Sequence, residues 1–457
     1  MNSSKFLIVA LLVAMIPALA VAYDFKEGGL CYNVNPDGKS VTTTYEHLIL
    51  FALDAPMPSD RGYAGDIVIP EKVTHEGKTY TVTAIGRDAF SCNIDLRNVA
   101  IPKTVKKIGQ GAFMNCGLSE IVLPPDLEEI SERAFAESDL KSIIIPNKVK
   151  TIGPSAFSNC YFKTLTIPNS VKKIEKSAFS CCRWLENVEI GQSVEKIGEA
   201  AFSICTSIKS IDLPASVKEI GEKAFYECIA LESVNIPASV SDIKAGAFSS
   251  CEKLKSIMVE KGNKKYDSRD NCNAIIETAT GKLIMGCNGT IIPNSVTSIE
   301  NEAFQGCEDI ESIEIPNSVT KIGDLSFFYC RKLRNLVIPN SVTSIGERAF
   351  CGCDSLKSVV IGNSVKYIGY GAFLHDESIK SITIGSGVTV IDSWAFKGLD
   401  SITTITTLIA NPESVKMGKD VFDEIKYSAC TLCVPRGAAS AYKAAPQWNN
   451  FKNIIEK

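Results

Sequence analysis

Residues 231–251 read LESVNIPASVSDIKAGAFSSC, and this arrangement of apolar residues returns along most of the chain. Its phenylalanine recurs at steps of 22 or 23 residues, with one longer gap of 56 residues. The phenylalanines of the two series are Phe90, Phe113, Phe135, Phe157, Phe179, Phe202, Phe225 and Phe248, then Phe304, Phe327, Phe350, Phe373 and Phe396. A fixed period of this length indicates one supersecondary unit per repeat, stacked so that neighbouring units share a continuous core. The sequence therefore predicts a repeat solenoid.

Within each repeat the pattern L-x-S-I-x-I-P predicts a short strand followed by a turn. Ile211 and Leu213 alternate with one polar residue, which is the period of a half-buried strand. Pro214 ends that strand, because proline lacks the backbone donor that a ladder needs. Ile220, Ala224 and Cys228 follow at four-residue steps, which predicts a short helical turn that must be held by packing.

The segments IPNSVTKIGDLSFFYC, from Ile315 to Cys330, and IPNSVTSIGERAFCGC, from Ile338 to Cys353, resemble the BspA-like bacterial surface leucine-rich repeats. The resemblance covers nearly the whole mature chain. It implies a right-handed leucine-rich-repeat coil with short parallel strands, short helical turns and a cap at each end. It also implies a secreted or cell-surface protein associated with adhesion to host proteins, matrix or other cells, although a shared fold does not by itself transfer function.

The chain divides into four predicted regions. Residues 1–22 are expected to be a secretory signal peptide, because an apolar run precedes a small-x-small cleavage site that ends at Ala22. An uncleaved anchor is the alternative, and no membrane span is expected in the mature chain. Residues 23–80 are expected to form an N-terminal cap, residues 81–405 the repeats, and residues 406–457 a degenerate last repeat and C-terminal cap.

The long gap between Phe248 and Phe304 predicts an insertion at about residues 260–290. Two apolar runs flank a glycine-containing loop there, which is typical of a β-hairpin. If Glu277 pairs with Lys282, the same register places Cys272 opposite Cys287. This register suggests a cross-strand disulfide between these two cysteines in a secreted protein, and free thiols are the favoured alternative.

Most of the 17 cysteines follow a repeat phenylalanine by three residues, as Cys228 follows Phe225. Such cysteines should stack with parallel side chains, which is the wrong geometry for disulfides. We expect them to be buried thiols that act as small apolar residues. No metal site is predicted, because Cys430 and Cys433 have no second pair of ligands nearby in the sequence.

Composition and motifs argue against catalysis and nucleic-acid binding. The three histidines, His47, His75 and His375, are scattered, and no catalytic or phosphate-binding motif is present. No catalytic residue and no cofactor are therefore expected, and a secreted enzyme is the least favoured alternative. Lysine and arginine are dispersed and the net charge is −4, so nucleic acid is not expected as a partner.

The strand face is the candidate binding surface. In L-x-S-I-x-I the third and fifth residues should point outward, which creates a uniform row of small polar residues beside a varied row. The predicted site residues, third and fifth positions of three successive repeats, are Ser210, Asp212, Ser233, Asn235, Ser256 and Met258. Such extended faces commonly bind proteins or glycans. An extracellular protein or glycan is the expected partner, glycan binding or scaffolding of an extracellular complex is the alternative function, and the oligomeric state stays open.

Overall fold

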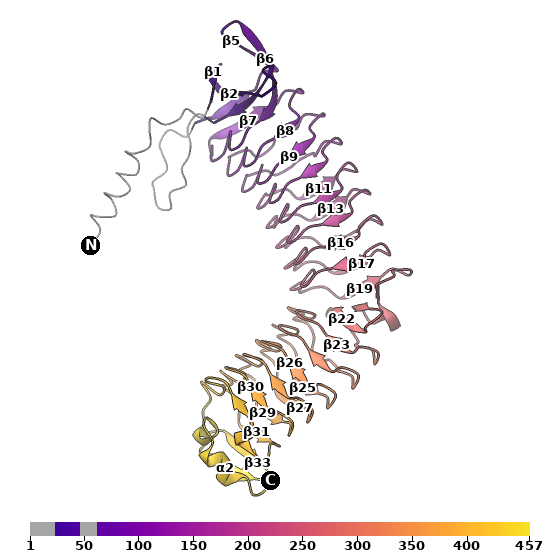
Figure 1. Ribbon diagram of the computed structural model, residues 1–457, viewed down its shortest axis with the longest axis vertical. Helices are drawn as coiled ribbons and strands as arrows, with labels where there is room; N and C mark the ends of the chain where they lie inside the picture. The colour runs from indigo at the N-terminus through magenta and orange to yellow at the C-terminus, as the bar shows by residue number, and fades with distance from the viewer. Residues whose placement is uncertain (1–22, 46–61) are drawn as a thin grey trace, which may run out of the picture. The chain divides into compact units, whose positions relative to one another are not determined.

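A computed structural model describes residues 23–45 and 62–457, which fall into two compact units that meet in sequence at Cys160 and Tyr161. The predicted signal peptide and His47 lie outside the described residues. In both units a coil has up to two strands, namely a first strand from the L-x-S-I-x-I segment and a second strand ending in the isoleucine that follows the turn (Figure 1). The segments 120–123, 142–145 and 312–315 form no first strand. The strands of successive coils pair in parallel, so the predicted solenoid is confirmed.

In the first unit, the second strands continue a sheet that starts in the N-terminal region. This sheet runs in the order β1 (Phe25–Glu27), β2 (Leu30–Val34), β3 (Ser40–Thr44), β6 (Lys78–Ile85), β8 (Lys107–Ile108), β9 (Glu129–Ile130) and β10 (Thr151–Ile152), with β5 (Lys72–His75) paired to β6. Among the described residues of this unit the first strands are β4 (Gly65–Val68) and β7 (Leu96–Ala100), which pair in parallel with Val68 opposite Ala100. The repeat pattern therefore begins at β4, inside the region expected to be the N-terminal cap.

In the second unit, the first strands form three separate ladders. These are β11 (Thr164–Ile167) with β13 (Asn187–Ile190); β15 (Ser210–Ile211), β17 (Ser233–Ile236) and β19 (Ser256–Val259); and β25 (Asn335–Ile338), β27 (Ser358–Ile361), β29 (Ser381–Ile384), β31 (Thr404–Thr407), β33 (Thr431–Val434) and β34 (Asn453–Glu456).

The second strands of this unit form two ladders. One consists of β12 (Lys173–Ile174), β14 (Lys196–Ile197), β16 (Glu219–Ile220) and β18 (Asp242–Ile243). The other consists of β20 (Tyr266–Asp267), β21 (Ile275–Glu277), β22 (Lys282–Met285), β23 (Ser298–Ile299), β24 (Lys321–Ile322), β26 (Ser344–Ile345), β28 (Tyr367–Ile368), β30 (Val390–Ile391) and β32 (Lys416–Met417).

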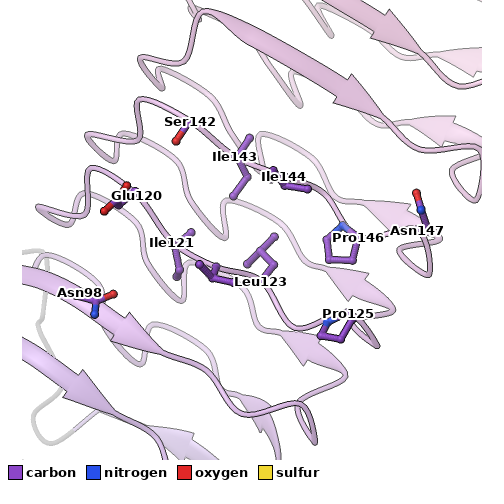
Figure 2. Close-up of a pocket in the computed structure, with 11 residues that line it drawn as sticks. Asn98, Glu120, Ile121, Leu123, Pro125, Ser142, Ile143, Ile144, Pro146 and Asn147 are labelled. Carbon is purple, nitrogen blue, oxygen red and sulfur yellow. The ribbon is translucent and has the colours of Figure 1, made fainter.

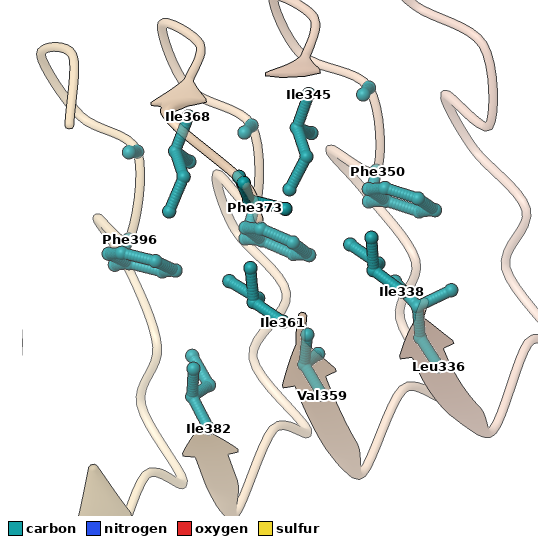
Figure 3. Close-up of a cluster of buried hydrophobic side chains, with 14 of the residues drawn as sticks. Leu336, Ile338, Ile345, Phe350, Val359, Ile361, Ile368, Phe373, Ile382 and Phe396 are labelled. Atoms are coloured by element: carbon teal, nitrogen blue, oxygen red, sulfur yellow. The ribbon is translucent and has the colours of Figure 1, made fainter. Parts of the chain in front are cut away.

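The repeat phenylalanines form the centre of the core. Their rings stack face to face on the next coil, with centroids 5.2 Å apart for Phe90 and Phe113 and 5.3 Å apart for Phe350 and Phe373. Figure 3 shows isoleucines of the second strands on one side of this ladder and residues of the first strands, such as Val359, on the other. Each buried phenylalanine contributes about 1.5–3 kcal/mol, so the period of the sequence is the period of the core.

The segment around each phenylalanine differs from the helical turn that was expected. It forms consecutive turns, and the residues two before and two after the phenylalanine have positive φ in every coil, as at Lys223 and Glu227 around Phe225. A helix cannot continue through left-handed residues. The backbone N–H groups instead bond to the next coil, for example from Phe225 N to Ala247 O at 2.8 Å.

The cysteine ladder is buried, and all 17 cysteines lie in the described residues as free thiols. Its members also donate a weak hydrogen bond, since Cys228 Sγ lies 3.3 Å from the carbonyl oxygen of Phe202 in the preceding coil. Ser138 makes the same contact with Phe113. Burial raises the pKa of Cys228 to about 12, so this thiol stays protonated and can donate.

The insertion contains the hairpin β21–β22, in which Glu277 pairs with Lys282 as expected from the sequence. The disulfide that this register suggested between Cys272 and Cys287 is absent, and both residues are free thiols. A bulge between Ile275 and Ile276 shifts the register by one residue before the ladder reaches the cysteines. The shift removes the alignment on which the prediction depended.

Strand β22 takes the place of a second strand and adds that side of one coil to the core. It pairs in parallel with β23, and Gly286 N donates to Ala303 O at 2.8 Å, which is the bond that a repeat phenylalanine makes elsewhere. A Cβ atom on Gly286 would lie 2.1 Å from the Phe304 ring, so only glycine fits. On the turn side the coils of Phe248 and Phe304 are direct neighbours, because Ser250 N donates to Gln305 O at 2.8 Å.

The C-terminal segment covers the last phenylalanine of the core. Phe422 stacks on Phe396 at 5.7 Å, and Trp448 and Phe451 pack on its other side at 4.9 and 5.4 Å. The short helices here are η2 (Pro412–Ser414), α2 (Ala439–Ala444) and η3 (Trp448–Asn450); η1 (Arg269–Asn271) lies in the insertion. The aromatic residues of the tail therefore close the open end of the core.

Candidate binding surfaces

Five of the six predicted site residues lie on the outward face of β15, β17 and β19, and Asp212 directly follows β15. Ser256 is half-buried, and the other five are exposed. Ser210 pairs with Ser233, and Ser233 pairs with Ser256, so the third positions form one continuous row. Asn235 pairs with Met258 in the adjacent row, which Asp212 continues. The residues between these rows, such as Val234, are buried. We call these six side chains the polar patch.

Neighbouring contacts hold part of the polar patch in place. Asn235 Nδ2 donates to Glu260 Oε1 at 3.0 Å, and Glu260 Oε2 accepts from the backbone N–H of Ala238 at 3.0 Å. Ser256 Oγ donates to Asn273 Oδ1 in the insertion at 3.3 Å. Met258 keeps 55% of its surface exposed. The patch thus combines small hydroxyls, one carboxylate, one amide and one flexible apolar side chain, and the insertion borders it.

A second surface, which the sequence analysis did not single out, lies in the first unit. It is a groove of 620 Å³ that crosses successive coils and is lined mainly by apolar residues of the segments 120–125 and 142–147. Figure 2 shows Asn98, Glu120 and Ser142 along one side of this groove and Pro125, Pro146 and Asn147 along the other. We call it the apolar groove.

The fifth-position row explains why the two surfaces differ. In the first unit this row consists of Val68, Ala100, Val122 and Ile144, all apolar and exposed. From β11 to β17 of the second unit the corresponding residues are polar, namely Thr166, Glu189, Asp212 and Asn235. The sequence carries this signal, but it becomes visible only when the row is extended back to Val68, which pairs with Ala100.

A smaller groove of 490 Å³ lies beside the insertion in the second unit. Its lining includes Asp270 and Cys272 of the insertion and Ile291, which is 77% exposed at a fifth position. The nearby acid Asp267 is engaged by Arg269, with Nε and Nη2 at 2.7 and 2.6 Å from its two carboxylate oxygens. The inserted segment therefore adds polar groups to one edge of an apolar surface.

The described histidines do not converge. His75 Nδ1 lies 3.0 Å from Glu27 Oε1, and the His75 ring stacks on Phe25 in the N-terminal sheet. His375 has a left-handed backbone and lies in the turn after Phe373. Residues 23–45 and 62–457 contain no group of three or more His, Cys, Asp or Glu arranged to hold a metal ion.

Charged side chains pair between coils rather than forming a patch of one sign. Lys196 and Glu219 on β14 and β16 are 2.8 Å apart, and Lys218 and Glu195 are 2.7 Å apart. These cations are therefore paired with acids of a neighbouring coil. No helix in the described part of the chain is long and apolar enough to cross a membrane.

Residues 77–184, 172–280 and 285–430 match the BspA type leucine-rich repeat region (6 copies). The structure is similar to that of a leucine-rich cell-surface protein from Faecalibacterium prausnitzii A2-165, with 30% identity, coverage of 84% of this chain and 94% of that chain, and a TM-score of 0.63. It is also similar to a leucine-rich repeat protein from Bacteroides ovatus ATCC 8483, with 28% identity, coverage of 95% and 100%, and a TM-score of 0.61.

The pneumococcal vaccine antigen PcpA shares the fold at 21% identity, with coverage of 95% of this chain and 98% of that chain and a TM-score of 0.58. No match is found among curated protein sequences. Because the matched repeat regions cover most of the chain, this protein belongs to the BspA-type leucine-rich repeat family.

Proposed function

We propose that this protein is a non-catalytic, secreted or cell-surface recognition protein that adheres to an extracellular protein through its first-strand face. The observation that carries the proposal is the polar patch, in which outward-facing side chains of three laddered strands lie in register, with Asp212 just beyond the end of β15. The likeness to a cell-surface protein of Faecalibacterium prausnitzii supports an extracellular location. A signal peptide that ends near Ala22 is part of the same proposal.

The chemistry of the polar patch suits recognition of a protein. The serine row lets a partner backbone approach closely, because a small hydroxyl occupies little space and can both donate and accept hydrogen bonds. The adjacent row varies from Asp212 to Asn235 to Met258 and can therefore discriminate between partners. Met258 supplies an adaptable apolar contact of the kind that is common at binding surfaces. Ladder hydrogen bonds hold the row rigid, which reduces the entropy lost on binding.

The test is a binding screen with purified protein against extracellular-matrix proteins and glycans, followed by substitutions in the patch. We expect at least one matrix protein to bind, and Ser233→Arg and Asn235→Arg to weaken that binding at least tenfold by steric and charge interference. Ser241→Arg is the matched control, since Ser241 is an exposed serine of the same coil on the second-strand side. It should leave the affinity unchanged.

Each alternative has its own outcome in this screen. Binding only to glycans would replace the protein partner by the glycan-binding alternative. Absence of binding to every probe, or binding that is lost in Ser241→Arg but kept in Ser233→Arg, would reject the proposed role of the patch.

A further inference from the structure

Three of the four most exposed large aliphatic side chains of the described residues lie in the apolar groove and its row. Val68, Val122 and Ile144 expose 73%, 84% and 85% of their surface. Exposure of single apolar residues is ordinary, but several in one line over a groove mark an interaction surface. The groove belongs to the first unit and contains no residue of the polar patch, so the inference below can fail without the proposed function failing.

The backbone beneath the groove is also less paired than elsewhere. Among the described residues, no backbone hydrogen bond joins residues 120–123 to residues 142–145, whereas β17 and β19 are fully laddered at the same positions. These coils are shorter, because one residue separates Cys116 from Leu118 where two separate Cys228 from Leu231. Beneath the groove these segments therefore lie without the ladder hydrogen bonds that join β17 and β19.

We propose that the apolar groove binds an amphipathic α-helix of a partner protein, which lies across the coils with its apolar stripe on Val68, Ala100, Val122 and Ile144. Recognition of a helix in a groove requires apolar anchors at the spacing of helical turns. The row supplies one anchor per coil.

The spacing of the coils favours a helix over a strand. The coils of the first unit are 5.2 Å apart at the phenylalanine ladder. A helix rises about 5.4 Å per turn. Over the three coil spacings from Val68 to Ile144, the apolar side chains of a helix would therefore stay within about 1 Å of the anchor residues along the row. A strand laid along the row presents one side chain per face every ~6.6 Å. It would drift by about 4 Å over the same distance and lose its alignment with the anchors.

The polar side of the groove indicates the charge of the partner helix. Asp66 and Glu120 lie in the third-position row beside the apolar anchors, and both are exposed. Neither forms an ion pair with another residue of the described parts of the first unit. On the opposite side Lys148 and Lys106 share the single carboxylate of Asp126, so this cluster keeps an excess of one positive charge. A helix with lysine or arginine along one flank of its apolar stripe would complement this arrangement.

The experiment uses the whole protein and two synthetic 18-residue peptides of identical leucine and lysine composition. One peptide places leucine at helical spacing, and the other alternates leucine and lysine as in a strand. Fluorescence anisotropy should show at least tenfold tighter binding of the helical peptide. Val122→Asp and Ile144→Asp should each weaken that binding at least tenfold, while Glu120→Lys should weaken it severalfold and more strongly at low salt.

Val337→Asp is the matched control, because Val337 is an exposed fifth-position valine of β25 in the second unit. It should not change the affinity. Equal or tighter binding of the alternating peptide, no detectable binding of either peptide, or unchanged binding by Ile144→Asp would overturn the proposal. Binding of the protein to phosphatidylcholine vesicles that Val122→Asp abolishes, without binding of the helical peptide, would assign the row to a membrane surface and would also overturn it.

Discussion

Asp376 interrupts the cysteine ladder, and replacing it with asparagine should stabilise the protein. Asp376 is fully buried three residues after Phe373, at the position that Cys353 holds in the preceding coil. Its Oδ1 accepts the backbone N–H of Cys353 at 2.7 Å, but its Oδ2 has no hydrogen-bond partner. Other residues at this position donate to the phenylalanine carbonyl of the preceding coil, as Cys353 Sγ does to Phe327 O at 3.4 Å.

A carboxylate cannot donate such a bond, whereas a protonated carboxyl group can. Burial accordingly raises the pKa of Asp376 well above its ordinary value. Asp376→Asn keeps the acceptor for Cys353 and places an NH₂ donor where Oδ2 now lies. Because an unsatisfied buried polar group costs about 1–3 kcal/mol, the substitution should raise the free energy of local unfolding by about that amount at pH 7.5.

The gain should depend on pH. A group whose pKa is higher in the folded state than in the unfolded chain contributes stability that is fully present below the unfolded pKa, about 3.9 for Asp, and is lost as the pH rises through the folded pKa. The wild-type penalty is therefore small near pH 4 and grows toward neutral pH. The advantage of Asp376→Asn should be largest at pH 7.5 and close to zero at pH 4.

Hydrogen exchange followed by mass spectrometry on peptides covering residues 370–380 measures this local stability. A gain of about 1–3 kcal/mol slows exchange roughly 5- to 150-fold. Glu377→Gln is the control, because Glu377 is an exposed acid in the same peptide and a surface substitution there should change exchange little. Faster exchange in Asp376→Asn at pH 7.5, or an equal advantage at both pH values, would refute the reasoning.

Two further predictions concern the turns and the thiols. Arg133→Gly should raise the free energy of unfolding by up to about 1 kcal/mol, since Arg133 is exposed with φ of 53° and glycine adopts that conformation without strain. Glu132→Gly, at an exposed neighbouring residue without positive φ, should lower the free energy of unfolding by about 0.5–1 kcal/mol. Thermal unfolding measures both variants, and a less stable Arg133→Gly than Glu132→Gly would contradict the prediction. Native protein treated with iodoacetamide at pH 8 should be alkylated first at Cys181, the only partly exposed cysteine, because burial raises the pKa of thiols such as Cys205 and Cys228. After unfolding without reductant all 17 cysteines should react, and intact mass spectrometry that finds two fewer alkyl groups would reveal a disulfide.

The regular part of the fold is predictable because the same positions of the repeat are buried in every coil. The residues Ile220, Ala224, Phe225 and Cys228 are all buried, so the apolar positions of one repeat identify the core of all of them. The outward rows of the first strands follow from the same alternation, which is why the polar patch could be located from its spacing. The helical turn was wrong because four-residue apolar spacing also fits two left-handed residues that flank a buried phenylalanine.

The irregular features required contacts that one repeat does not contain. The bulge at Ile275 moves Cys272 out of alignment with Cys287, and the local sequence pattern does not predict this bulge. The glycine that follows the isoleucine of the second strand, such as Gly221 after Ile220, shows a related limit. Gly221 is not in the left-handed region, as its replacement by glutamate or lysine in other repeats implies, but a Cβ there would lie 2.5 Å from the backbone of Gly198 in the preceding coil.

The sequence by itself determined the repeat, its buried positions, the two outward rows and the place of the insertion, because each depends on a periodicity that one coil imposes on the next. Only the tertiary structure decided where the first-strand ladder is broken, and hence that Val122 and Ile144 border a groove while Ser233 and Asn235 lie on a continuous sheet. Val122 and Ile144 occupy the same fifth position of the repeat as Asn235. The two surfaces differ in the side chains of the fifth-position row and in the backbone beneath it, because ladder hydrogen bonds join neighbouring coils at Ser233 and Asn235 but not at Val122 and Ile144.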